Sequence, residues 1–326
     1  MHVRLIDANT LGYAQYFIGR KQHPDDTSPR ALRGFLEHIR GRLHFDRETL
    51  NVIIWDGLAQ WRYDLLELYK SSRGKTPEQR EARAAYEPQR PAIQEALRHL
   101  PVLQVTHHGA EADDVAFGLA RRLAAQGHLV SLSTSDTDWL CILAARIQWV
   151  NARKLTHVIE LDGFAAATGF TSPARYIEGK ALAGDPTDDI PGVPGVALKR
   201  AAELMTRFGD LSSILAAAQD LMVFSQGPKY QHALTDPDVR AAVVRNLTLM
   251  DLSKGPALRG SDIELAVGDC DGLALADVFA DNGMSDCFEN WHFWQRAVDQ
   301  ELSKGTVQTI ERAVAGIEQS WQPGAV

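Results

Sequence analysis

Acidic side chains stand at the ends of three predicted β-strands. Asp7 follows VRLI, Asp56 follows VIIW, and Asp136 follows LVSLSTS. A single Asp in this place is most often a turn former or a helix cap. In an open parallel sheet, however, ligands bind at the carboxyl ends of the strands, so independent strands would deliver these side chains to one crevice. We therefore treat all three as candidate functional residues.

Two denser acidic clusters accompany them. Glu111, Asp113 and Asp114 open a predicted helix, and Asp136 and Asp138 form a D-x-D pair. Acidic residues are favoured in a first helical turn because of the helix dipole. That accounts for one or two carboxylates, but three within four positions repel one another unless cations neutralise them.

A further acidic pair, Asp185 and Asp188, precedes the stretch IPGVPGV. The prolines and glycines predict a rigid hairpin between two helices, and a helix–hairpin–helix presents backbone N–H groups that suit a phosphate. An ordinary turn with a capping Asp would give the same pattern. The candidate phosphate contacts here are Gly192, Gly195, Lys199 and Arg200.

The acidic clusters come without a matching His or Cys pattern, which favours hard cations such as Mg²⁺ or Mn²⁺. The candidate ligands are Asp7, Asp56, Glu111, Asp113, Asp114, Asp136, Asp138, Asp185 and Asp188. Two cations ~4 Å apart could activate water and stabilise a leaving oxygen. Phosphatases and polymerases share this chemistry, so the residues alone leave the substrate open.

Composition fits an ordinary soluble chain, with 45% apolar and 23% charged residues. The three cysteines are widely spaced, which argues against disulfides or zinc and fits a reducing cytoplasm. No apolar run approaches the ~20 residues that span a bilayer, and the first residues lack the features of a signal peptide. The net charge of −8 disfavours binding to DNA, although a net charge can hide a basic patch.

Residues 1–165 alternate short apolar strands with helical stretches, which predicts a parallel α/β sheet. The expected strands are His2–Ile6, Val52–Trp55, Val102–Thr106, Leu129–Ser133, Ile147–Val150 and His157–Leu161. The expected helices are Leu32–Leu43, Pro91–Leu100 and Asp113–Ala125. Residues 70–90 interrupt this order with a polar stretch that carries six Lys/Arg against three Glu.

From about residue 170 we expect the strands to stop and a mainly helical unit to follow. Its predicted helices are Arg175–Ala183, Ala197–Phe208, Leu211–Ala217, Asp238–Asp251 and Leu273–Asn282. Residues 299–326 read as a tail with one short helix.

An ordered set of segments carries a family resemblance: LIDANTLGY, IIWDG, LYKSSR, GAEADDVAFGLA, STSDTDWL and ALAGDPTDDIPGVPGVALKRAAELMTRFGDL. Between about residues 2 and 295 the chain resembles the flap endonuclease and 5′-3′ exonuclease family, found in bacterial DNA polymerase I and as stand-alone bacteriophage enzymes. The resemblance implies a PIN-like core at 1–168 with a helical arch at about 70–90. A helix–three-turn–helix region at 169–298, with its helix–hairpin–helix at about 182–208, would bind duplex.

The resemblance also assigns roles. All nine carboxylates match metal ligands, with Asp185 and Asp188 contributed from the second region. Lys70 and Arg73 match basic residues at the base of the arch that contact the scissile phosphate. Tyr69 either stacks on a displaced base or packs at a helix end. As part of an arch, Lys75, Arg80 and Arg83 would form an electrostatic funnel for a single-stranded 5′ end.

The sequence departs from the family pattern at three positions. Ala14 stands where an Arg is usual, Asp189 replaces a usual Asn, and Ala197 replaces the second Gly of the hairpin. We expect these changes to affect the affinity for duplex more than cleavage.

These observations predict a metal-dependent 5′ nuclease that acts on DNA with 5′ ends, flaps or junctions in replication or repair. The expected cofactor is Mg²⁺, with Mn²⁺ able to substitute and K⁺ at the helix–hairpin–helix. We expect a monomer that uses no membrane, works beside a separate DNA polymerase, and acts in the cytoplasm of a bacterial or phage-infected cell. The alternatives are a catalytically silent DNA-junction-binding protein and a PIN-type ribonuclease.

Overall fold

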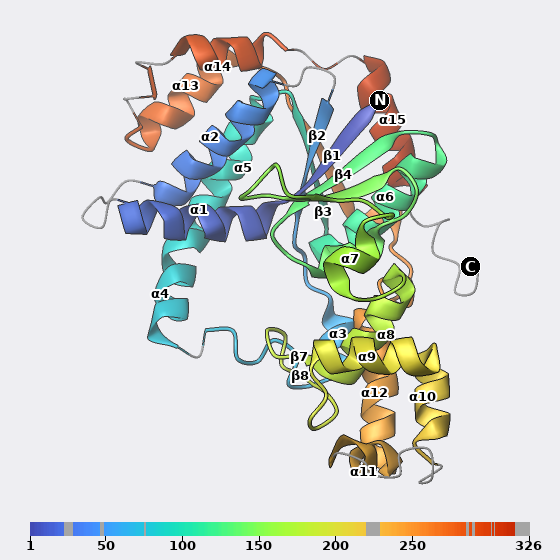
Figure 1. The fold of residues 1–326 in the computed structure, drawn as a ribbon. Coiled ribbons are helices and arrows are strands. Elements are labelled where there is room, and N and C mark those ends of the chain that lie inside the picture. The colour runs from blue at the N-terminus through green and yellow to red at the C-terminus, as the bar shows by residue number, and fades with distance from the viewer. Residues whose placement is uncertain are drawn as a thin grey trace.

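A seven-stranded sheet forms the centre of the molecule, in the order β6-β5-β4-β1-β2-β3-β9 (Figure 1). The computed structural model describes residues 1–22, 29–45, 49–74, 76–219, 229–284, 287–288, 291–300, 302 and 304–316. The strands are β1 (His2–Asp7), β2 (Thr49–Trp55), β3 (Val102–His107), β4 (Leu129–Thr134), β5 (Ile147–Asn151), β6 (Val158–Ile159) and β9 (Ile263–Val267). Strands β1 to β5 pair in parallel, and β6 and β9 are antiparallel at the two edges.

Helices cover both faces of this sheet, as expected for a mostly parallel sheet. Successive residues of β2 point to opposite sides: Val52 and Ile54 join one apolar cluster, and Ile53 and Trp55 join the other. The first face is covered by α6 (Ala112–Ala125), η2 (Asp138–Ile142) and α15 (Lys304–Ala315). The second face is covered by α1 (Ala8–Gln22), α2 (Arg30–Phe45), α5 (Arg90–Arg98), α13 (Gly272–Asp281) and α14 (Trp291–Val298).

The chain returns to the core after the helical region, which the sequence did not predict. The expectation that strands stop at about residue 170 is wrong, because β9 pairs antiparallel with β3 at the edge of the main sheet. Helices α13 and α14 pack against α5 and α2 (Figure 1). Strand β9 and helices α13 and α14 therefore lie on the N-terminal core, whereas the sequence placed their residues in the duplex-binding region.

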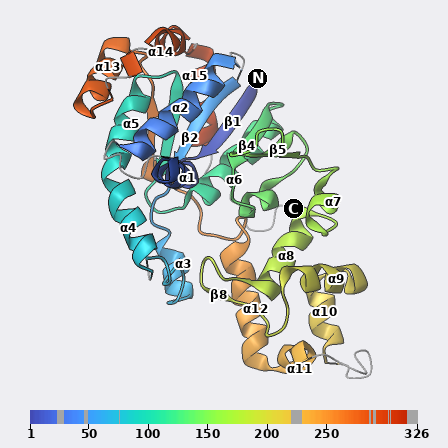
Figure 2. The ribbon, with the colours of Figure 1, turned by 60° about the vertical axis from the view of Figure 1, so that its left-hand side comes forward.

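The helical region lies beyond the carboxyl ends of the strands (Figures 1 and 2). Its helices are α7 (Phe164–Thr168), α8 (Pro173–Ala183), α9 (Leu198–Phe208), α10 (Leu211–Ala217), α11 (Lys229–Thr235) and α12 (Pro237–Met250). The predicted hairpin is present between α8 and α9, where β7 (Gly184–Asp185) pairs with β8 (Ile190–Pro191). A Cβ at Gly192 would lie 2.0 Å from the Ala183 carbonyl oxygen, so only glycine allows the hairpin to approach the end of α8 so closely.

The arch predicted at about residues 70–90 contains residues 70–74 and 76, α4 (Pro77–Tyr86) and η1 (Glu87–Gln89), and α3 (Gln60–Leu65) precedes it at its base. Helix α4 begins with a capping box between Thr76 and Gln79. The Tyr86 ring then packs on Gly12 of α1, where an added Cβ would lie 2.4 Å from the ring. Figure 2 shows α4 between α5 and α3, away from the sheet.

The predicted fold class is confirmed: an α/β core with a helical arch, followed by a mainly helical region. The short helix η3 (Gly260–Asp262) leads into β9, and the single helix expected in the tail is α15. Among the residues described, no helix combines the length and apolar character needed to cross a membrane.

Candidate active site

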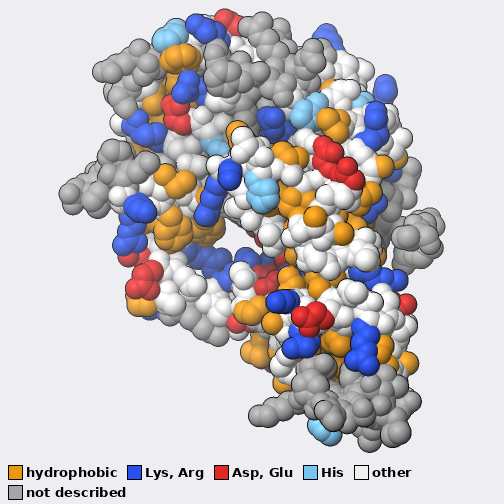
Figure 3. All heavy atoms as spheres, viewed as in Figure 1, with side chains coloured by type: hydrophobic (Ala, Val, Ile, Leu, Met, Phe, Trp, Pro, Cys, Tyr) orange, Lys and Arg blue, Asp and Glu red, His pale blue; other side chains and the backbone are white. Residues whose placement is uncertain are grey.

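A cleft of about 820 Å³ lies where the sheet, the arch and the hairpin meet. Figure 3 shows the molecule hollowed here, with Lys and Arg side chains beside Asp and Glu along the margin. Eight of the nine predicted carboxylates line it: Asp7, Asp56, Glu111, Asp113, Asp136, Asp138, Asp185 and Asp188. Lys70, Arg73 and Arg83 line it as well.

Asp7 and Asp56 are held at the strand ends by neutral donors. Asp7 accepts from the Thr10 backbone N–H at 2.9 Å and from the Thr134 hydroxyl at 2.9 Å. Asp56 accepts from the Ala112 backbone N–H at 2.8 Å and from the Asn9 amide at 2.5 Å. Their orientation is therefore fixed without a positive side chain.

Asp113 and Asp136 are held in the same way. Asp113 accepts from the Trp139 indole N–H at 2.6 Å, and Asp136 accepts from the Asp138 backbone N–H at 2.8 Å. We call Asp7, Asp56, Asp113 and Asp136 the sheet-edge carboxylates. In the part of the chain that the structure describes, none of them forms an ion pair.

Burial and like charges raise the pKa values of Asp7, Asp113 and Asp136. Burial, with Asp56 nearby, raises the pKa of Asp7. Burial and the Asp136 charge raise the pKa of Asp113 well above its usual range. Burial and the Asp138 charge raise the pKa of Asp136 to about 7. A divalent cation would relieve this repulsion.

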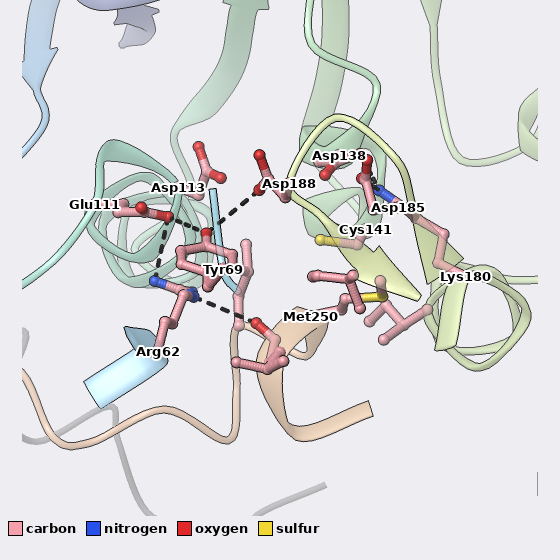
Figure 4. Close-up of a pocket in the computed structure, with 14 residues that line it drawn as sticks. Arg62, Tyr69, Glu111, Asp113, Asp138, Cys141, Lys180, Asp185, Asp188 and Met250 are labelled. Atoms are coloured by element: carbon pink, nitrogen blue, oxygen red, sulfur yellow. Dashed lines mark hydrogen bonds and ion pairs between the residues drawn. The ribbon is translucent and has the colours of Figure 1, made fainter. Parts of the chain in front are cut away.

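The other four carboxylates of the cleft, which we call the hairpin-side carboxylates, are paired with cations. They are Glu111, Asp138, Asp185 and Asp188. The Lys70 ammonium lies 2.5 Å from Glu111, and the Arg73 guanidinium lies 2.7 Å from Asp188. Lys180 contacts Asp138 and lies 2.9 Å from Asp185 (Figure 4).

These pairs oppose the effect of burial on the pKa values. Burial would raise the pKa of Glu111, but Lys70 and Arg62 outweigh it and the net shift is downward. For Asp185, burial is likewise outweighed by Lys180, and its pKa is lowered. At Asp138 burial prevails over Lys180, and the pKa is raised.

The arch base and the hairpin are joined by hydrogen bonds. The Lys70 backbone N–H donates to the Asp188 carbonyl at 2.9 Å, and the Ser72 N–H donates to the Asp189 carboxylate at 2.5 Å. Lys70 and Asp189 both have a positive φ, of 52° and 56°. Asp and Asn tolerate a positive φ better than most residues do, so Asp189 can adopt the same conformation as the usual Asn. Its carboxylate also holds the arch through the hydrogen bond from Ser72.

Tyr69 packs inside the protein, which is the second of its two predicted roles. It is 3% exposed, and its ring lies edge-on against Tyr63. Its hydroxyl lies 2.9 Å from Glu111 and 3.3 Å from Asp188, and donates to this pair of carboxylates (Figure 4). The tyrosine thus bridges the core and the hairpin.

Asp114 is the one predicted ligand that the structure does not bring to the cleft. It is 2% exposed, and its two oxygens accept from the two terminal nitrogens of Arg62, both at 2.7 Å. Asp113 and Asp114 are neighbours on α6, and neighbouring helical residues point about 100° apart. One of them therefore faces the cleft while the other faces the interior.

The predicted DNA contacts are distributed unevenly. Arg83 lines the cleft, whereas the Arg80 side chain folds back and donates to the Gly74 carbonyl at 3.0 Å. Lys75 lies outside the described residues. Lys199 and Arg200 are exposed on α9, outside the lining of the cleft, and Gly195 has the φ of +86° that glycine readily adopts.

The remaining two departures from the family pattern also border the cleft. Ala14 is 7% exposed and contributes no charge to the cleft wall. Ala197 precedes α9 as its N-cap residue and makes no side-chain cap bond.

Several residues of the site were missed by the sequence reasoning. Lys180 is in the last turn of α8, where a basic residue is expected for the helix dipole alone. Arg62, Asn9 and Trp139 have no pattern in the sequence that marks them as partners of carboxylates. All four act through contacts between segments that are distant in the chain.

The cleft has the ligand chemistry that Mg²⁺ or Mn²⁺ requires: clustered carboxylates, among them Asp113 and Asp136, whose pKa values are raised by burial and by neighbouring negative charge. Among the described residues, however, no three acidic, His or Cys side chains already form a group that could hold an ion. Lys70 and Lys180 instead pair with the four hairpin-side carboxylates. The residues therefore fit divalent cations in their chemistry, and a cation on the hairpin side would have to displace Lys70 or Lys180.

Sequence comparison identifies two family profiles. The 5′-3′ exonuclease N-terminal resolvase-like domain matches residues 2–169, and the 5′-3′ exonuclease C-terminal SAM fold matches residues 171–263. The 5′-3′ exonuclease of Streptomyces coelicolor is 31% identical, over 66% of this chain and 75% of the relative. The thermostable DNA polymerase I of Thermus thermophilus is 29% identical over 65% of this chain, which spans about a quarter (24%) of that relative.

Solved structures with the same fold include nucleases bound to metal ions or DNA. The bacteriophage T5 5′-exonuclease with bound divalent metal ions (zinc) has a TM-score of 0.63 at 20% identity, covering 86% of this chain and 98% of the other. The T5 flap endonuclease, in a pseudo-enzyme-product complex with DNA and metal ions, has a TM-score of 0.64 at 20% identity. This match covers 96% of this chain and 99% of the T5 flap endonuclease chain.

Proposed function

Since the chain belongs to the 5′-3′ exonuclease family, we propose that it is a structure-specific 5′ nuclease. It hydrolyses DNA phosphodiesters with two divalent metal ions, in replication or repair. The observation that carries the proposal is the convergence of eight carboxylates, Lys70 and Arg73 in one cleft beside the arch.

The proposed cofactor is Mg²⁺, for which Mn²⁺ substitutes. The sheet-edge carboxylates would hold one ion, and the hairpin-side carboxylates would contribute to the second. When bound, such ions lower the pKa of water and stabilise charge on the attacking and leaving oxygens. K⁺ is proposed at the hairpin, near Gly192 and Gly195.

The cations of the chain do the remaining electrostatic work. Lys70 is held at the cleft by Glu111, and Arg73 by Asp188. Both can donate to the non-bridging oxygens of a phosphate, where fixed positive charge stabilises the transition state more than the ground state. The neutral donors to Asp7 and Asp56 keep these carboxylates oriented while substrate enters.

The shape of the cleft supports a substrate with a single-stranded 5′ end. A strand would enter beside α4, whose Arg83 lines the cleft. Lys199 and Arg200, which are exposed on α9, would contact the phosphates of the duplex. We further propose a monomer in the bacterial or phage-infected cytoplasm, which works beside a separate DNA polymerase.

The test is cleavage of a 5′-labelled DNA flap with and without Mg²⁺. A blunt duplex, a 3′ flap and a single-stranded RNA serve as controls. We expect Mg²⁺-dependent release of the 5′ segment from the 5′ flap. Binding to junctions without cleavage in Mg²⁺ or Mn²⁺ would favour the silent binding protein, and preferential cleavage of RNA would favour the ribonuclease.

A further inference from the structure

Arg62 is a buried cation that the cleft chemistry does not use. It lies in α3 at the base of the arch and is 2% exposed. Its guanidinium forms a two-pronged pair with Asp114, and one terminal nitrogen lies 3.4 Å from the Glu111 carboxylate. Its Nε donates to the Leu249 carbonyl at 3.3 Å (Figure 4).

Asp114 is fully engaged by these contacts. Its Oδ1 accepts from Arg62, and its Oδ2 accepts from Arg62 and from the Glu111 backbone N–H at 3.0 Å. It does not line the cleft that holds the other eight carboxylates. A cation in the cleft could reach Asp114 only if the buried pair separated, which would leave an uncompensated charge inside the protein.

We propose that Arg62 and Asp114 are a positioning pair, and that Asp114 is not a metal ligand. The pair fixes the Glu111 carboxylate, and with it the divalent-cation site, without touching the cation or the DNA. This inference rests on the proposed function, since it assigns how one carboxylate of that site is held.

The geometry suits this role. A guanidinium and a carboxylate joined by two parallel hydrogen bonds have a fixed mutual orientation, which an ammonium cannot reproduce. Asp114 also holds the backbone of Glu111 at the start of α6. The same arginine reaches the Leu249 carbonyl in the last turn of α12, where helix carbonyls lack partners within the helix. Arg62 thereby ties the arch base, the core and the helical region to one carboxylate.

The test is a double-mutant cycle read by Mn²⁺ binding to the metal-free protein, without DNA, by titration calorimetry. The variants are Arg62→Lys, Asp114→Asn and the double variant. Arg62→Lys keeps the positive charge but loses the two parallel hydrogen bonds to Asp114. Weaker binding of Mn²⁺ by this variant would therefore result from the lost geometry. Each single variant should weaken Mn²⁺ binding by about 10–100-fold, as is common for groups that orient a metal ligand. The double variant should bind Mn²⁺ no more weakly than the single variant that has the lower affinity.

The control is Arg175→Lys, which alters an Arg–Glu178 pair of 2.6 Å on α8 outside the cleft. Its Mn²⁺ affinity should match wild type. Thermal unfolding of every variant sets a temperature at which all are folded. Should Asp114→Asn not fold, Arg62→Lys decides alone.

Two results would overturn the inference. If Asp114→Asn weakens Mn²⁺ binding by the same factor in the wild-type and Arg62→Lys backgrounds, Asp114 acts on the metal directly. If Arg62→Lys binds Mn²⁺ like wild type while wild type cleaves the 5′ flap, the inference fails and the proposed function stands. A wild-type protein that neither binds Mn²⁺ nor cleaves the flap would contradict both the inference and the proposed function.

Discussion

The two halves of the cleft carry the same number of carboxylates but treat their charge in opposite ways. The sheet-edge carboxylates are oriented by neutral donors such as Thr134, Asn9 and Trp139. The hairpin-side carboxylates are paired with cations, chiefly Lys70, Arg73 and Lys180. Burial and the Asp138 charge raise the pKa of Asp136, whereas Lys70 and Arg62 outweigh burial and lower the pKa of Glu111.

The difference indicates how the site would fill. Uncompensated negative charge attracts a divalent cation most strongly, so the sheet-edge carboxylates should bind the tighter ion. A cation on the hairpin side competes with Lys70 and Lys180 for the carboxylates. Once displaced from the carboxylates, these two lysines would be available to a phosphate. Variants in the two halves should therefore differ in the size and sign of their effects.

The largest effect should come from Asp136→Ala at the sheet edge. Removing one preorganised charge from a site of this kind costs about 10²–10³-fold in rate, and we expect the upper end because the tighter ion is affected. Binding of the flap should survive. Single-turnover cleavage in Mg²⁺, with exposed Asp277→Ala as control, checks the prediction. Turnover near wild type would show that Asp136 is not a ligand.

Lys70→Ala should have the next largest effect, through the transition state. One positive charge near the reacting phosphate contributes roughly 2–4 kcal/mol there, while in the ground state it is one phosphate contact among several. The single-turnover rate should therefore fall more than the affinity for DNA. Lys254→Ala, a half-exposed lysine paired with Asp251, is the control. Equal losses in rate and affinity would make Lys70 a general phosphate anchor.

Replacing Asp185 and Asp188 with Asn should act mainly on metal loading. The change keeps the shape of the hairpin and removes both charges, while Lys180 retains Asp138 as its partner. The Mg²⁺ concentration at half-maximal cleavage should rise by about 10–100-fold, with the fold and DNA binding preserved. Superimposable Mg²⁺ titrations would mean that the two aspartates only cap the hairpin.

The sequence predicts the sheet-edge half better than the hairpin-side half, for a physical reason. Asp7, Asp56 and Asp136 follow strands, and parallel strands bring their carboxyl ends together whatever the details of packing. Lys180 meets Asp138 only because the hairpin folds back on the core, and no local pattern encodes that contact. Asp114 lies outside the cleft where the sequence placed it, because adjacent acidic residues on a helix look equivalent until packing shows which one faces inward.

The same limit explains the missed strand. The five residues of β9 are only partly buried, and their pairing with the edge of β3 stabilises them as a strand. A short segment of this kind has too little periodicity to be distinguished from a loop.

The smallest effect, and the most direct comparison of the two halves, concerns the stability of the metal-free protein. Asp136 has a pKa raised to about 7 in the folded state, mainly by burial, against about 3.9 in an unfolded chain. The folded state thus binds the proton more tightly. The stability from this proton is present below about pH 4 and is lost as the pH rises through about 7. Glu111 has a lowered pKa, so its stabilising effect is present above its unfolded value and is lost as the pH falls.

Neutral variants should therefore shift the melting temperature in opposite directions at pH 8 in EDTA. Asp136→Asn removes a negative charge that burial and the Asp138 carboxylate disfavour. The melting temperature should therefore rise by about 2–4 °C, which corresponds to ~1 kcal/mol in a protein of moderate size. Glu111→Gln removes the partner of Lys70 and Arg62 and should lower it. At pH 5 the gain from Asp136→Asn should shrink, because Asp136 is then protonated in the folded wild type. Calorimetric melting at both pH values decides the matter: shifts of the same sign at pH 8 would mean that the two halves do not differ in their balance of charge.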